Sequence, residues 1–131
     1  MDWKLELVAI PVSDVDRAKA FYEQAGFVAD HDHRVSDTLR FVQLTPPGSG
    51  CSIAIGEGVT EAEVGSVKGM QLVVSDIEAA RKHLVDRGVE VTDVQRFDWG
   101  AFVFFSDPDG NAWAVQESTA EMSARSEGAD G

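Results

Sequence analysis

The stretch Val12-Ser13-Asp14-Val15-Asp16-Arg17-Ala18-Lys19 decides the fold, because it occurs twice in the chain. It returns 62 residues later as Val74-Ser75-Asp76-Ile77-Glu78-Ala79-Ala80-Arg81, and the register holds without a gap through Gly26 in the first copy and Gly88 in the second. A fixed internal period is typical of a duplicated structural unit. The chain is therefore expected to contain two copies of one module.

Each copy lies between a predicted strand and a predicted helix. The apolar runs Leu7–Val12 and Met70–Val74 precede the two copies, and their length suits strands better than helices. In the helices that follow, apolar side chains recur every three or four residues, so each helix has one stripe to pack against a sheet. The stripes are Val15, Ala18, Phe21 and Tyr22 in the first helix and Ile77, Ala80, Leu84 and Val85 in the second.

The helix ends carry signals of their own. Ser75 with Glu78 fits the S-x-x-E capping box, and Ser13 with Asp16 fits a weaker version of it. The aspartates that follow the two serines are also expected at the helix starts. Left-handed C-terminal caps are expected at Gly26 and Gly88.

Beyond each helix the pattern changes to extended segments separated by turns. The predicted strands are Val28–His33, Leu39–Leu44 and Cys51–Ile55 in the first half, and Glu90–Gln95, Ala101–Phe105 and Ala112–Gln116 in the second. The predicted fold class is therefore α+β, with two tandem βαβββ modules. The first module covers 1–56, a linker 57–68, the second module 69–118 and a disordered tail 119–131, all within one compact domain.

Composition and charge exclude several classes of function. The 131 residues include 11 Lys and Arg against 23 Asp and Glu, which gives a net charge of −12. Nucleic acids and anionic membranes are bound by clustered cations, so neither is an expected partner, whereas a neutral or cationic small molecule is compatible. Cys51 is the only cysteine, which excludes an internal disulfide. Without a signal-peptide pattern or a long apolar run, we expect a cytoplasmic protein.

The duplicated motif is joined by two further stretches, Ala20-Phe21-Tyr22 with Gly26-Phe27, and Phe105-Ser106-Asp107-Pro108-Asp109-Gly110-Asn111. In this order and spacing the pattern resembles the vicinal oxygen chelate superfamily, which includes glyoxalase I, extradiol dioxygenases, fosfomycin-modifying enzymes and bleomycin resistance proteins. The resemblance covers roughly residues 4 to 117. It implies βαβββ modules that curl into open, U-shaped half-barrels around a ligand cavity, and a homodimer.

The resemblance also implies where a metal would be bound. Metal-dependent members carry one ligand on the first strand and one on the last strand of each module. The matching positions here are Leu7, Ala54, Gly69 and Ala114. A divalent ion needs imidazole nitrogen or carboxylate oxygen, which none of these residues supplies. No metal and no other cofactor is therefore expected.

Strand alternation and the resemblance together predict the cavity wall. Alternation places small, neutral side chains on the cavity side of the first and last strands. In the fosfomycin-modifying branch the positions of Phe102 and Phe104 face the cavity, and with Trp99 they are expected to stack on a planar ligand. The predicted ligand-binding residues are Leu7, Ala9, His31, Ala54, Gln71, Trp99, Phe102, Phe104, Ala114 and Gln116.

Two pairs of polar residues admit both a chemical and a structural interpretation. His31 and His33 share one side of a strand and could hold a metal or relay a proton, or they could simply be a solvated strand end. Asp107 and Asp109 could form an acid–base pair, but in a D-P-D-G hairpin such acids usually accept backbone N–H bonds. The structural interpretation is favoured for both pairs, and no catalytic residue is assigned.

The sequence therefore favours a metal-independent, small-molecule-binding protein similar to drug-sequestering bleomycin resistance proteins, with a role in antibiotic resistance. Its ligand would be aromatic, apolar or cationic. The alternative is a glyoxalase-like lyase or isomerase, or another enzyme of the superfamily, with a non-standard metal site around His31 and His33 or with none. A third possibility is a structural or regulatory subunit with a vestigial cavity.

Overall fold

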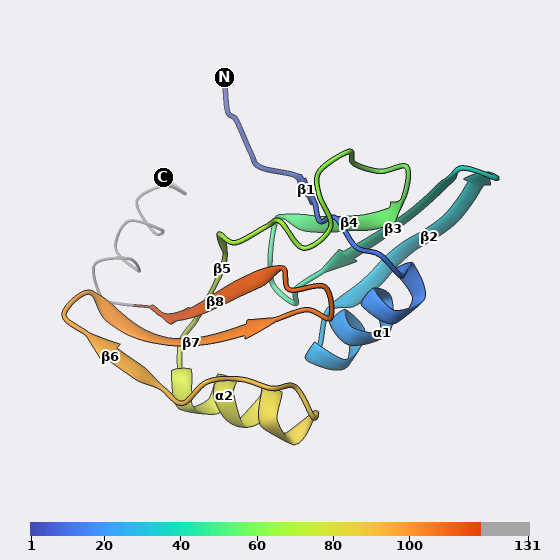
Figure 1. The fold of residues 1–131 in the computed structure, drawn as a ribbon. Coiled ribbons are helices and arrows are strands. Elements are labelled where there is room, and N and C mark those ends of the chain that lie inside the picture. The colour runs from blue at the N-terminus through green and yellow to red at the C-terminus, as the bar shows by residue number, and fades with distance from the viewer. Residues whose placement is uncertain (119–131) are drawn as a thin grey trace. The chain divides into compact units, whose positions relative to one another are not determined.

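A computed structural model describes residues 1–118 and contains two four-stranded sheets and two helices (Figure 1). The predicted tail 119–131 lies outside the described residues. Both halves follow the order βαβββ, which confirms the predicted fold class. The elements are β1 Leu7–Ala9, α1 Val15–Ala25, β2 Val28–Ser36, β3 Leu39–Thr45, β4 Ser52–Glu57, β5 Met70–Val74, α2 Ile77–Asp86, β6 Gln95–Phe97, β7 Gly100–Ser106 and β8 Ala112–Glu117. Neither helix of this described part is long and apolar enough to cross a membrane.

The two sheets repeat one topology, β1-β4-β3-β2 and β5-β8-β7-β6. The first strand of each module pairs in parallel with the last, so that Ala9 lies opposite Ala54 and Gln71 lies opposite Ala114. The pairs β2–β3, β3–β4 and β6–β7 are antiparallel. Since each sheet of the described chain has two edge strands, both sheets are open and neither closes into a barrel.

The chain divides into two compact units whose boundary differs from that of the sequence repeat. Among the described residues, the first unit contains Met1–Lys68 and Ser106–Ala112, and the second contains Gly69–Phe105 and residues 113–118. The turn between β7 and β8 therefore belongs to the second repeat in sequence but to the first unit in space.

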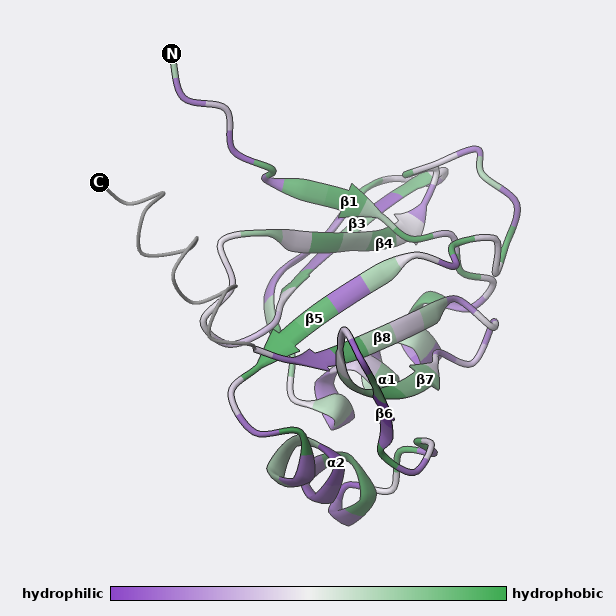
Figure 2. Ribbon diagram, turned by 90° about the vertical axis from the view of Figure 1, so that its left-hand side faces the viewer, coloured by the Kyte–Doolittle hydropathy of each residue, from purple (hydrophilic) through white to green (hydrophobic). Residues whose placement is uncertain are grey.

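Each unit buries its own apolar core between helix and sheet. In the first unit α1 packs on β3 and β4, and the side chain of Tyr22 is completely buried. In the second unit Ile77 and Leu84 of α2 are buried, and both hydrophobic and hydrophilic colours run along this helix in Figure 2. Val85, predicted for the same stripe, is instead exposed. One apolar stripe per helix is thus enough to hold each helix to its sheet.

The helix starts are capped by aspartates. The carboxylates of Asp14 and Asp76 each accept a hydrogen bond from the backbone N–H three residues later, at 3.0 and 3.1 Å. The capping-box prediction is therefore wrong by one residue, because the preceding serines do not make this bond. Gly26 and Gly88 have φ of 114° and 78°, which confirms the left-handed conformation predicted for both.

The predicted strand Glu90–Gln95 is wrong, since β6 begins only at its last residue. The reason is an irregular pairing with β7. The backbone N–H of Phe104 donates to the Thr92 hydroxyl at 3.0 Å, while the Thr92 carbonyl accepts from Arg81 Nε at 3.0 Å. A side-chain oxygen has replaced the backbone acceptor of a regular ladder, so the strand does not extend through this segment.

Candidate functional site

The second unit contains a pocket of about 530 Å³. All four strands of its sheet contribute to the lining, together with the turn between β6 and β7. Phe102 and Phe104 reach it because alternate residues of β7 share one face of the sheet. No lining residue is ionisable. The lining is Gln71, Phe97, Trp99, Phe102, Phe104, Ala114 and Gln116.

Four of these residues form an aromatic wall, defined here as Phe97, Trp99, Phe102 and Phe104. Phe97 stacks on Trp99 with ring centroids 4.9 Å apart and planes 5° apart. Phe102 stacks on Phe104 at 6.0 Å and 8°, and Phe97 joins the two pairs at 5.9 Å from Phe102. Trp99 is 66% exposed and Phe104 36%, so ring surface remains open. Clustered aromatic surface of this kind is typical of a binding site.

The polar side of the pocket consists of two glutamines on neighbouring strands. Gln71 Nε2 on β5 donates to Gln116 Oε1 on β8 at 2.6 Å. Gln116 Nε2 in turn donates to the backbone carbonyl of Trp99 at 3.3 Å. The pocket therefore combines apolar rings with a short amide chain and offers neither an acid nor a base.

The structure brings together the predicted site residues that belong to the second half of the chain. They are Gln71, Trp99, Phe102, Phe104, Ala114 and Gln116. Phe97 also lines the pocket and was missed, because the strand predicted before it was placed too early. The signal that could have found it is its spacing of two residues from Trp99, which matches the spacing of Phe102 and Phe104.

The other predicted residues lie in the first unit and are not part of this lining. Leu7 is exposed, Ala9 is half-buried, and Ala54 has no exposed surface. His31 lies exposed on β2, where its ring stacks on that of His33 with centroids 5.7 Å apart. A ligand-binding role for these four residues stays a prediction.

The family is identified by comparison with known proteins. The model of the Glyoxalase/Bleomycin resistance protein/Dioxygenase superfamily matches residues 4–115. The chain belongs to this superfamily. The resemblance inferred from the duplicated motif is thereby confirmed.

Similar solved structures include TnmS3, an antibiotic binding protein from Streptomyces sp. CB03234. Its TM-score is 0.80 at 32% identity, with 90% of this chain and 98% of that chain covered. A superfamily member from Sphaerobacter thermophilus has a TM-score of 0.77 at 32% identity, covering 89% and 98%. Among curated proteins, the uncharacterized YetH of Bacillus subtilis strain 168 is 26% identical over 113 residues, covering 84% and 94%.

The residues at the metal positions implied by the resemblance are not suited to bind a metal ion. Those positions hold Leu7, Ala54, Gly69 and Ala114, and none of these residues has a donor atom on its side chain. Within residues 1–118, no group of three or more His, Cys, Asp or Glu side chains could hold a metal ion. These positions therefore support no metal-dependent step.

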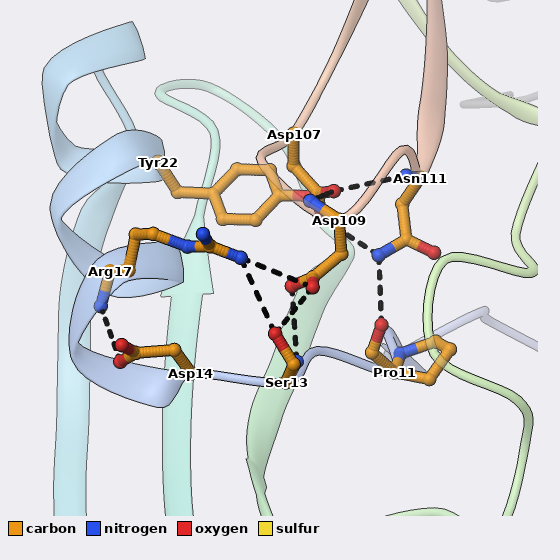
Figure 3. Close-up of polar contacts among 8 residues, drawn as sticks. All are labelled: Pro11, Ser13, Asp14, Arg17, Tyr22, Asp107, Asp109 and Asn111. Atoms are coloured by element: carbon orange, nitrogen blue, oxygen red, sulfur yellow. Dashed lines mark hydrogen bonds and ion pairs between the residues drawn. The ribbon is translucent and has the colours of Figure 1, made fainter.

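The acids of the D-P-D-G turn are fully used in structural hydrogen bonds (Figure 3). The buried Asp107 carboxylate accepts bonds from the Tyr22 hydroxyl at 2.8 Å and from Asn111 Nδ2 at 2.8 Å. It also accepts from the backbone N–H groups of Asp109 and Asn111, both at 2.9 Å. A carboxylate with four donors is a structural acceptor, so the geometry supports the turn interpretation over an acid–base pair.

The same turn holds the start of α1. Asp109 accepts from the Ser13 hydroxyl at 2.6 Å and from Arg17 Nη2 at 3.3 Å, and Asn111 Nδ2 donates to the Pro11 carbonyl at 2.9 Å (Figure 3). We call this set the interlock. It comprises the turn Ser106–Ala112 with Pro11, Ser13, Arg17 and Tyr22.

Proposed function

We propose that this protein binds a planar aromatic small molecule in the pocket of its second unit and retains it without chemical conversion. The observation that carries the proposal is the aromatic wall, whose two stacked pairs leave ring surface open in a lining without ionisable groups. Apolar burial contributes about 25 cal/mol per Å², so covering a few hundred Å² offsets the entropy lost on binding. Binding of this kind needs no catalytic group.

The relatives support the same proposal. TnmS3, an antibiotic binding protein, shares 32% of its residues with this chain over nearly its whole length. A pocket that holds a compound by stacking alone can protect a cell by lowering the free concentration of that compound. We therefore propose sequestration of an antibiotic-like ligand, without a metal, as the biological role.

Tryptophan fluorescence tests the binding step directly. Trp99 lines the pocket, whereas Trp3 is 87% exposed outside it, so a Trp3→Phe background reduces the unrelated signal. We expect saturable quenching by neutral planar aromatic compounds from a panel that also contains cationic ones. Phe104→Ala in that background should weaken binding about tenfold, as expected for a lost stacking partner, whereas Val35→Ala on the exposed part of β2 should not. A panel without saturable quenching would contradict the proposal.

Metal analysis separates sequestration from the enzyme alternative. That alternative relies on the stacked rings of His31 and His33 as a displaced metal site. We expect purified protein to leave gel filtration without stoichiometric zinc, nickel, manganese or iron. A retained ion that is lost in the His31→Ala, His33→Ala double variant would favour the enzyme.

We also propose that the protein is a homodimer. Among residues 1–118, β1 pairs only with β4, so one of its edges is unpaired in this part of the chain. The residues before it alternate between charged side chains and the exposed Trp3 and Leu5, which is the pattern of a strand with an apolar side to cover. Light scattering after gel filtration should give twice the chain mass, and a monomer mass at micromolar concentration would contradict this.

A further inference from the structure

The glutamines of the pocket have a hydrogen-bond direction that is fixed by the backbone. The Trp99 carbonyl can only accept, so Gln116 must present its Nε2 to it, at 3.3 Å. Gln116 Oε1 is then turned to Gln71, whose Nε2 donates to it at 2.6 Å. In the described chain this leaves Gln71 Oε1 as an acceptor without a partner on the lining of the pocket.

The backbone around Gly100 makes room for this arrangement. Gly100 has a φ of 150°, and a Cβ there would lie 2.8 Å from Gln116 Nε2 and 3.4 Å from the ring of Phe102. Any other residue would push Gln116 away from the Trp99 carbonyl. A residue with a side chain at this position would adopt a strained φ and would displace Gln116 Nε2, so glycine keeps the amide chain in place.

We propose that Gln71 selects neutral planar ligands that carry a hydrogen-bond donor, such as a phenolic hydroxyl. This inference rests on the proposed function of the pocket. A ligand stacked on the aromatic wall removes water from Gln71. A hydroxyl then donates to Oε1, and its own oxygen accepts the second N–H of the amide. An ether of the same shape leaves Oε1 desolvated and unpaired, which lowers its affinity.

The lining also explains why the selected group is neutral. No ionisable side chain borders the pocket, so neither a phenolate nor an ammonium group would find a counter-charge among the lining residues. A charged group buried there would lose its hydration without an ion pair in return. A neutral hydroxyl can both donate to the oxygen and accept from the N–H of one primary amide.

The test compares two probes with one ring system, 2-naphthol and 2-methoxynaphthalene, by equilibrium dialysis at pH 7. We expect the protein to bind 2-naphthol about five- to tenfold more tightly, as one net hydrogen bond implies. Gln71→Leu should bind both probes equally, because removing the amide takes away both the hydrogen bond to the hydroxyl and the desolvation penalty that the ether meets at Oε1. Gln24→Leu, an exposed glutamine on α1, serves as the matched control and should keep the preference.

Three other results of the dialysis experiment would contradict either the selection by Gln71 or the proposed binding function. Equal binding of the two probes by the unaltered protein would overturn selection by Gln71 and leave the proposed binding function intact. A preference that persists in Gln71→Leu, with the unfolding midpoint unchanged, would assign donor recognition to another group and overturn the inference. Failure of both probes to bind the unaltered protein would overturn the proposed function, and selection with it.

Discussion

A single hydrogen bond from the Tyr22 hydroxyl connects α1 to Asp107 in the turn 106–112. The hydroxyl donates to a buried carboxylate that has three further donors, all from the turn itself. A buried hydrogen bond to a charged group is worth more than an average one, because both partners have lost their water. Tyr22 should therefore contribute more to stability through this one atom than an exposed hydroxyl does.

We expect Tyr22→Phe to lower the free energy of unfolding by about 1–3 kcal/mol, with little change in packing since the ring is kept. Urea denaturation followed by circular dichroism measures this. Ser66→Ala removes an exposed hydroxyl of the same unit and should change stability by less than about 0.5 kcal/mol. Equal effects of the two substitutions would show that the bond to Asp107 adds nothing.

Residue-scale predictions from sequence succeeded where the signal is local. The D-P-D-G pattern predicts a turn because its four residues contain the whole signal. The partner of that turn is Tyr22, 85 residues away from Asp107, and the sequence predicts it only as part of a helix stripe. The interlock was missed because nothing in a local pattern links a tyrosine to a distant carboxylate.

At the scale of elements, the helix starts distinguish two capping models. The sequence predicts capping by Ser75, whereas the structure places the bond on Asp76. We expect Asp76→Ala to lower the free energy of unfolding by about 1 kcal/mol and Ser75→Ala to lower it by much less. Denaturant titrations of both variants measure the difference. A larger effect for Ser75→Ala would restore the capping box.

An ion cluster holds β2 to its neighbours. Arg40 on β3 makes two bonds to the Asp32 carboxylate, at 3.0 and 2.9 Å, and Lys19 on α1 makes a third at 3.0 Å. These bonds, that of Arg40 first, hold the pKa of Asp32 well below its usual range. A depressed pKa contributes stability above the unfolded-state pKa, near 4, and this contribution is lost as the pH falls through the folded-state pKa.

We therefore expect Asp32→Asn to lower the free energy of unfolding by about 1 kcal/mol at pH 7. Below about pH 4 the difference in the free energy of unfolding between the variant and the unaltered protein should shrink. At such pH the ionised Asp32 carboxylate contributes progressively less stability to the unaltered protein. Urea titrations between pH 3 and 7 measure this. Asp93→Asn removes a single ion-pair partner of Arg81 from a highly exposed position and should lower the free energy of unfolding by much less. A difference for Asp32→Asn that is constant with pH would exclude the ionic explanation.

The predicted helices and strands agree with the structure where the pattern of apolar residues is compatible with only one kind of element. β5 has the predicted bounds, because a short apolar run between polar neighbours allows little else. The strand before β7 was misplaced because its course depends on Arg81 of α2, which takes the Thr92 carbonyl. The error also concealed Phe97, because alternation along a strand that ends at Gln95 does not assign Phe97 to a face of the sheet, whereas Trp99 was expected from the resemblance. Strand periodicity therefore gave information only as far as the strands were regular, and Phe102, Phe104 and Trp99 were expected from the resemblance instead.

At the scale of the whole molecule, the duplicated sequence does not give two independent folding units. The repeat boundary falls near Gly69, but the first unit also requires Ser106–Ala112 from the second repeat. The backbone N–H of Val67 donates to Asn111 Oδ1 at 3.1 Å, and Ala112 N–H donates to the Val67 carbonyl at 2.8 Å. The turn is thus bonded both at the start of α1 and at the end of the first repeat.

A fragment of residues 1–68 should therefore fail to fold cooperatively on its own. Without the turn, Tyr22 and Pro11 lose their hydrogen-bond partners inside the unit, along with those of Ser13 and Val67. Several such bonds at about 1 kcal/mol each are comparable to the 5–15 kcal/mol stability of a typical domain. Urea titration of the fragment should show no cooperative transition, and adding residues 69–131 in trans should restore one. The same complement carrying Asp107→Ala should restore less, because it lacks the carboxylate that Tyr22 requires. A cooperative transition of the isolated fragment at the midpoint of the full chain would instead show that the first repeat folds alone.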